Sequence, residues 1–103
     1  MSDEIVVYID SDLEDLTPGF LENRQNDTVV IDRLLQSRDL AEIQRLGHSM
    51  KGSGGGYGFD EITDIGAKIE EAAKEGDREE ILRQNERLSQ YLQNVKVVYQ
   101  DEE

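Results

Sequence analysis

Three residues of this 103-residue chain have types and a spacing that suit group-transfer chemistry: His48, Lys51 and Gly52. An imidazole with the ordinary pKa of about 6.5 is mostly uncharged near pH 7 and is then a competent nitrogen nucleophile. A nearby lysine supplies positive charge for the oxygens of a phosphoryl group, and a glycine leaves room for another molecule to approach in line. This combination favours a histidine that accepts and returns a phosphoryl group.

The apolar residues around His48 predict that it lies on the outer side of a helix. They recur at intervals of three or four residues and are Leu40, Ile43, Leu46 and Met50. Since each residue turns a helix by about 100°, His48 lies roughly 140° from Ile43 around the axis. The imidazole is therefore expected to face solvent, with Lys51 beside it one turn later. Without Lys51 and Gly52, an ordinary solvated histidine would be the better interpretation.

The end of this helix is harder to place, because six glycines lie between positions 47 and 58. Glycine in a helix interior costs about 1 kcal/mol relative to alanine, so propensity alone would end the helix at Gly52. Tyr57, however, follows Met50 by one heptad and keeps the phase of the apolar stripe. We therefore predict helix through about Tyr57.

The segment that begins at His48 resembles the signature of histidine-containing phosphotransfer (HPt) domains. The matching residues are His48-Ser49-Met50-Lys51-Gly52-Ser53, followed by a run of small residues and Gly58. The strict core, His-x-x-Lys-Gly-Ser, is short, but the resemblance extends through the helical pattern from about Leu13 to Leu92. It implies that His48 exchanges a phosphoryl group with the aspartate of a receiver domain in a bacterial two-component phosphorelay.

Short connections between the predicted helices favour an all-α fold, an up-and-down antiparallel four-helix bundle with an N-terminal helical extension. The extension begins at Asp10 to Asp12, and the bundle helices are predicted over about 27–37, 39–57, 60–76 and 77–95. Asp39 and Asp77 each precede a glutamate by three residues, which is a capping box at a helix start. We predict a single domain, residues 1–103, with its core over about 13–95.

Two segments rich in β-branched residues lie at the ends of this pattern. Residues 5–9, Ile-Val-Val-Tyr-Ile, predict a short extended segment. Residues 95–99, Val-Lys-Val-Val-Tyr, either pack against the first segment or continue the last helix. We favour continuation of the helix.

Glu70 and Lys68 are the residues of the following helix that are placed to contact His48. If the two helices form a hairpin that turns near Phe59, then His48, eleven residues before the turn, and Glu70, eleven after it, lie at one level. Ile69 belongs to the apolar stripe, so Lys68 and Glu70 lie on opposite sides of it. HPt domains often place a polar residue here, commonly an amide, that holds the second imidazole nitrogen. Glu70 departs from that pattern but is a candidate to orient His48 by accepting from Nδ1–H.

The resemblance implies a phosphocarrier rather than an autonomous kinase, and no nucleotide-binding segment is found. His48 is then the phosphorylated nucleophile, Lys51 neutralises developing charge, and Gly52 leaves room. Further candidate partner-binding residues are Gln44, Arg45, Gly55 and Lys68. The receiver domain is expected to bring Mg²⁺, so the chain itself needs no cofactor and no metal. The alternative is a helical docking or adaptor module that binds a receiver domain or another signalling partner and transfers nothing.

The composition argues against several other classes. A formal charge of −13 disfavours nucleic acid and anionic membrane surfaces as partners. One histidine and no cysteine cannot form an imidazole or thiolate metal cage. A nucleotide-binding P-loop requires lysine after its second glycine, whereas Lys51 precedes Gly52. With an acidic start and no long apolar run, we expect a cytoplasmic monomer.

Overall fold

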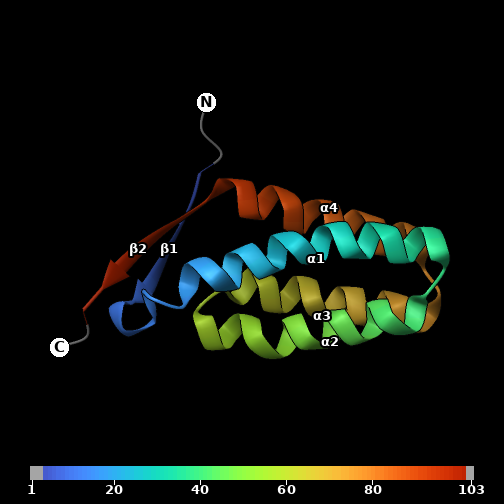
Figure 1. Ribbon diagram of the computed structural model, residues 1–103, viewed down its shortest axis with the longest axis horizontal. Helices are drawn as coiled ribbons and strands as arrows, with labels where there is room; N and C mark the ends of the chain where they lie inside the picture. Colours follow the sequence, from blue (N-terminus) through green and yellow to red (C-terminus); the bar gives the residue numbers. More distant parts are fainter. Residues whose placement is uncertain (1–3, 102–103) are drawn as a thin grey trace.

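Four helices make up most of the computed structural model, which describes residues 4–101 (Figure 1). They are α1 (Thr17–Ser37), α2 (Leu40–Gly54), α3 (Asp60–Glu75) and α4 (Arg78–Asn94). Each helix runs antiparallel to the next because the connections between them are short. The predicted up-and-down four-helix bundle is confirmed. None of the helices in the described part is long and apolar enough to cross a membrane.

The predicted break before residue 27 is wrong, because α1 is one continuous helix. The N-terminal helical extension was predicted to begin at Asp10 to Asp12, but Asp10 is extended and Ser11–Leu13 form a 3-10 turn. From Thr17 onward the extension forms the first half of α1, which has Pro18 in its first turn. Asp27 does not cap a new helix but pairs within α1 with Arg24, whose Nε donates to Asp27 Oδ2 at 2.8 Å. This ion pair between residues three apart lets Asp27 lie inside the helix, at the position where the sequence predicted a new helix to begin.

Side-chain caps and left-handed residues set the limits of the helices. Asp39 accepts from the backbone N–H of Glu42 at the start of α2, and Asp77 accepts from that of Glu80 at the start of α4. Both predicted capping boxes therefore supply the N-terminal cap. α3 ends at Gly76, whose φ is 70°, and α1 ends at Arg38, whose φ is 62°. Within residues 4–101, Arg38 is the one residue other than glycine that has a positive φ.

Replacing Arg38 by glycine is expected to stabilise the protein by about 0.5–1 kcal/mol. A side chain in the left-handed region is strained, and glycine relieves this strain at a helix end. The Arg38 side chain is exposed and forms no ion pair with the described residues, so its removal should cost few stabilising contacts. Urea unfolding followed by circular dichroism measures the gain. A loss of stability in Arg38→Gly would show that this helix end is not strained.

The core lies along the inner faces of all four helices. Its fully buried side chains include Ile31 of α1, Ile43 and Met50 of α2, Ile62, Ile65 and Ile69 of α3, and Ile81 and Leu88 of α4. Asn85 is the polar exception in the α4 stripe, and it is 4% exposed. Its Nδ2 donates to the carbonyl of Thr28 at 2.9 Å and to Asp32 Oδ1 at 3.1 Å, which joins α4 to α1. The buried residues of α3 and α4 thus form one apolar stripe along each helix.

The connection from α2 to α3 continues the helical winding and then reverses the chain. α2 ends at Gly54, and a 3-10 turn, Gly55–Tyr57, follows it directly, which agrees with the prediction of helix through about Tyr57. Gly58 has φ 89°, a conformation that favours glycine, and makes the reversal possible. Phe20 of α1 stacks on Tyr57 with ring centroids 4.2 Å apart and fixes this turn against the bundle.

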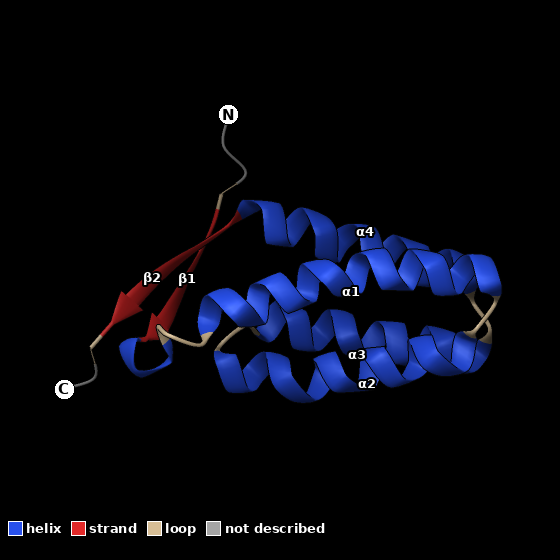
Figure 2. Ribbon diagram, viewed as in Figure 1, coloured by secondary structure: helices blue, strands red, loops and turns tan. Residues whose placement is uncertain are grey.

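Residues 95–99 form a strand, and the prediction that they continue the last helix is wrong. β1 (Ile5–Asp10) and β2 (Val95–Gln100) pair in parallel, with Ile5 opposite Val95 and Asp10 opposite Gln100 (Figure 2). The β-branched residues of β2 favour extended backbone once β1 offers hydrogen-bond partners. The predicted extended segment at residues 5–9 is confirmed, and a 3-10 turn, Ser11–Leu13, connects it to α1.

Candidate functional site

His48 lies in the middle of α2 with its imidazole in solvent. The side chain is 71% exposed, whereas Ile43 and Met50 of the same helix are fully buried. The stripe that anchors α2 in the core therefore lies away from His48. An approaching protein meets the ring without any displacement of the bundle.

Glu70 of α3 contacts both His48 and Lys51. Its Oε2 lies 2.8 Å from His48 Nδ1, and its Oε1 accepts from Lys51 Nζ at 3.3 Å. The Glu70 side chain is only 11% exposed, while Lys51 is 48% exposed. One nearly buried carboxylate thus contacts an imidazole and an ammonium group that are both open to solvent.

Two opposing effects act on the pKa of the Glu70 carboxyl. Burial raises it, but the hydrogen bonds from His48 and Lys51 and their positive charge together lower it by more. The net pKa of Glu70 lies below its ordinary value of 4.5, so the group is ionised at neutral pH. The stability that this carboxylate contributes is present above the unfolded-state pKa and is lost as the pH falls through the lowered value.

The ionised state of Glu70 determines which imidazole nitrogen carries the proton. A carboxylate only accepts hydrogen bonds, so the contact between Glu70 Oε2 and His48 requires a proton on Nδ1. The other nitrogen, Nε2, then keeps its lone pair in the neutral ring. The arrangement orients the imidazole with its unprotonated nitrogen directed away from Glu70.

Glycines bring α2 and α3 into backbone contact beneath the site. A Cβ at Gly47 would lie 2.6 Å from the backbone nitrogen of Glu70, and one at Gly66 would lie 2.5 Å from that of Lys51. Any side chain at either position would push the two helices apart. This close approach is what allows the short Glu70 side chain to reach both residues of α2.

A hollow of about 380 Å³ lies next to the imidazole. It is lined by Ala41, Gln44, Arg45, His48 and Glu70. Gln44 and Arg45 are thus beside His48, as the one-turn spacing predicts. Arg45 pairs with Glu42 on the surface, and this exposed pair leaves the guanidinium at the rim of the hollow.

Gly52, Gly55 and Lys68 have different relations to the site. A Cβ at Gly52 would meet nothing within 4 Å, so the surface one turn after His48 is open. Gly55 follows α2 and donates its N–H to Thr63 Oγ1 at 2.7 Å, which leaves its outer side in solvent. Lys68 pairs with Asp64 on α3 at 3.2 Å and does not line the hollow beside His48.

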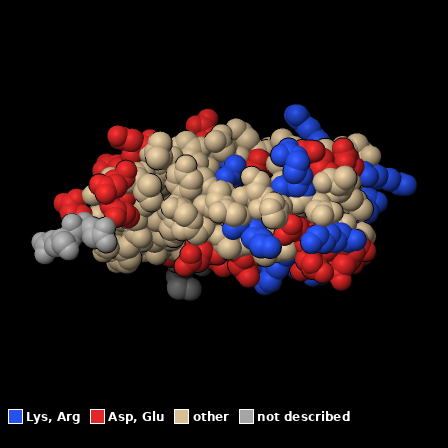
Figure 3. Space-filling view, turned by 90° about the horizontal axis from the view of Figure 1, so that it is seen from below, with Lys and Arg blue, Asp and Glu red and all other residues tan. Residues whose placement is uncertain are grey.

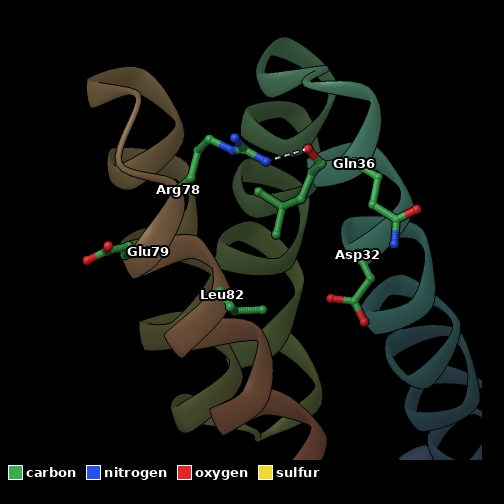
Figure 4. A pocket seen from close by; sticks show the side chains of 6 residues that line it. Asp32, Gln36, Arg78, Glu79 and Leu82 are labelled. Atoms are coloured by element: carbon green, nitrogen blue, oxygen red, sulfur yellow. Dashed lines mark hydrogen bonds between the residues drawn. The ribbon is translucent and has the colours of Figure 1, made fainter.

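Another hollow, of about 440 Å³, lies between α1 and α4 (Figure 4). Arg78 spans its upper part and donates to the carbonyl of Leu35 at 3.0 Å, with Asp32 and Gln36 on the facing helix. None of the predicted site residues lines it. Among residues 4–101, no group of three or more histidine, cysteine, aspartate or glutamate side chains is arranged to hold a metal ion.

Comparison with protein families agrees with this geometry. A family model described as Hpt domain matches residues 15–97. The chain belongs to the Hpt domain family. Hpt domains carry out histidine phosphotransfer in phosphorelays, and the matched range contains all four helices, with His48 on α2. A search of curated proteins and a search of solved structures each found no significant match.

The two contact glycines, Gly47 and Gly66, were not singled out from the sequence of this Hpt domain. A signal was present for Gly47, because Ile43, Gly47, Met50 and Gly54 are the buried positions of α2 and repeat in heptad phase. A glycine in phase with buried apolar residues indicates close helix packing. The same spacing holds for Gly66, which follows the buried Ile62 by four residues and precedes the buried Ile69 by three.

Proposed function

We propose that His48 accepts a phosphoryl group on Nε2 from the phospho-aspartate of a receiver domain and passes it on by the same route. The observation that carries this proposal is the exposed imidazole whose Nδ1 is held by Glu70 at 2.8 Å. Membership of the Hpt domain family supports the reaction class. The chain is then a phosphocarrier that depends on another protein for its phosphate.

In the proposed step, the Nε2 lone pair of His48 attacks phosphorus and the bond from phosphorus to the aspartate oxygen breaks. The aspartate leaves as a carboxylate, and positive charge develops on the imidazole. Glu70 lies against Nδ1 and stabilises that charge through the existing hydrogen bond. The return step reverses each of these changes, and no external base is required.

Lys51 is placed to neutralise charge on the phosphoryl oxygens. An ammonium group has three N–H donors, and the structure uses one of them on Glu70. Lys51 is half exposed and lies one turn further along α2 than His48, so its remaining donors can reach a phosphoryl group on the imidazole. Such a cation stabilises the transition state where charge spreads over the equatorial oxygens.

The face around the hollow beside His48 is the proposed docking surface for the receiver. Gln44 and Arg45 line the hollow on one side of the imidazole, and the open backbone at Gly52 lies on the other. The receiver would contribute its acidic pocket and Mg²⁺, which bridges phosphoryl oxygens. Gly55 lies just beyond the end of α2, whereas Lys68 has no contact among the described residues that supports a role at this face.

Incubation with receiver domains charged by acetyl phosphate, followed by mapping of the labelled residue, tests the proposal. We expect label on His48 that is lost in acid and retained in base, as phosphohistidine chemistry requires. A receiver that binds tightly but leaves no label would support the alternative of a docking or adaptor module. Label on another residue would contradict the assignment of His48.

Removing the Glu70 carboxylate is expected to slow transfer about three- to tenfold. Glu70→Ala loses the contact that fixes the tautomer and orientation of His48, whereas Glu70→Gln retains an acceptor oxygen and should recover part of the rate. Stopped-flow or quenched-flow labelling by a charged receiver measures both variants. Glu71→Ala, at the exposed neighbour on α3, is the matched control. Equal rates in Glu70→Ala and the control would remove Glu70 from the site.

A further inference from the structure

The parallel strand pair is a feature separate from the phosphotransfer bundle. The family match covers residues 15–97, so β1 lies wholly outside it and β2 partly outside. Both strands lie at the end of the bundle that carries the turn from α2 to α3 (Figure 1). His48 is in the middle of α2, and none of the residues that line its hollow belongs to a strand.

One edge of β1 has no strand beside it in the described part of the chain. β1 pairs only with β2, and the sheet has two strands. In a parallel pair, alternate residues direct their N–H and C=O groups away from the partner strand, so such an edge can accept another strand. Natural proteins commonly protect edges with lysine, proline or short length, but residues 5–9 are Ile-Val-Val-Tyr-Ile. Val6 and Tyr8 are 44% and 61% exposed.

A groove of about 590 Å³ lies beside β1, and none of the residues that line it belongs to β2. Four consecutive β1 residues, Ile5 to Tyr8, form one side of it. The other side consists of Gly58, Asp60, Glu61, Asp64 and Tyr91. At about 3.3 Å per residue, four strand residues present about 13 Å of edge, enough to align a short extended segment.

The far side of the groove is acidic. Arg87 pairs with Glu61 and with Asp64, at 2.6 and 2.9 Å, but no ion pair of Asp60 is found among the described residues. Burial raises the pKa of the Tyr91 hydroxyl to about 12, and the negative charges of Glu61 and Asp60 add to this effect. Figure 3 shows aspartate and glutamate, and no lysine or arginine, on the visible part of the end that carries the strands.

We propose that the free edge of β1 binds an extended basic segment of a partner protein as a third strand. The backbone of that segment pairs with β1, and its lysine or arginine side chains face Asp60 across the groove. Pairing of two copies of this chain through the same edge is disfavoured, because it would bring two acidic walls together in a chain of charge −13.

A synthetic peptide of alternating lysine and valine, capped at both ends, tests this binding. Titration into the ¹⁵N-labelled chain is expected to shift the backbone amides of residues 5–9 and 58–64, and added salt should weaken the binding. A peptide N-methylated at alternate residues cannot form the ladder and should not bind, and one with glutamate in place of lysine should bind at least tenfold more weakly. Equal binding of the three peptides, or no shifts up to about 1 mM lysine–valine peptide, would overturn the proposal.

Charge reversal at Asp60 provides a second test. Asp60→Lys is expected to weaken peptide binding about fivefold, because one attractive charge contact becomes repulsive. Glu79→Lys is the matched control, since both residues are first-turn acids of a helix and Glu79 lies outside the groove. Identical affinities in the two variants would contradict a role for the acidic side of the groove. Labelling of His48 is expected to be unchanged in both, which separates this proposal from phosphotransfer.

Dilution-dependent shifts of residues 5–9 without peptide would instead indicate pairing between two copies and overturn the proposal.

Discussion

His48→Gln is expected to abolish labelling of the protein by a phosphorylated receiver while the bundle remains folded. An amide has no nucleophilic nitrogen lone pair, so no bond to phosphorus can form. The side chain is 71% exposed, and its replacement should change the free energy of unfolding by no more than about 0.5 kcal/mol. Quantitative labelling, with urea unfolding of the same variant, measures the two effects separately.

The matched control for this variant is Gln44→Ala, which changes a polar residue at the rim of the same hollow. It leaves the nucleophile intact and is expected to lower the labelling rate without changing the labelled residue. Undiminished labelling of His48→Gln would show that another side chain accepts the phosphoryl group. Unfolding of that variant would show that the imidazole has a structural role, which its exposure argues against.

Gly66→Ala is expected to destabilise the protein by about 3 kcal/mol and to slow phosphotransfer. The added Cβ would lie 2.5 Å from the backbone nitrogen of Lys51 and 2.7 Å from the carbonyl of Gly47, so α2 and α3 must separate. A loss of this size is a large part of the total stability of a small domain. The separation also draws Glu70 away from His48, which removes the hydrogen bond that orients the imidazole.

Gly19→Ala is the control for this second prediction, because Gly19 is a helical glycine whose Cβ would meet nothing within 4 Å. It is expected to gain up to about 1 kcal/mol from helix propensity. Urea midpoints give the stability difference, and labelling rates under native conditions give the effect on the site. If Gly66→Ala were as stable as Gly19→Ala, the close contact between α2 and α3 would not be needed for the fold.

Local patterns were sufficient to predict much of the fold and the relative placement of His48 and Glu70. The apolar periodicity around His48 predicted the buried face of α2, and capping boxes predicted two helix starts. Glu70 was predicted to lie opposite His48 because the two residues are equally far in sequence from a turn at Phe59. That argument requires only that the two helices be straight and antiparallel. The chemical roles of Lys51 and Glu70 stay predictions until transfer is measured.

Interactions between distant segments could not be predicted in the same way. Whether residues 95–99 continue a helix or form a strand depends on the presence of β1, ninety residues earlier in the chain. The backbone contact at Gly66 likewise depends on which helix packs against α3 and how closely, and the spacing of buried residues within α3 does not encode either. The break expected at Asp27 failed because the same residue type that caps a helix also forms ion pairs within one.

The pairing of β1 with β2 also bears on the order in which the chain folds and opens. Neighbouring helices meet across short loops, whereas Ile5 meets Val95 only after the whole intervening chain has been brought together. We therefore expect the strand pair to form late in folding and to exchange its amide hydrogens faster than the helices, as a separate cooperative unit. Opening of this unit would release both ends of the described chain while His48 and its neighbours stay in place.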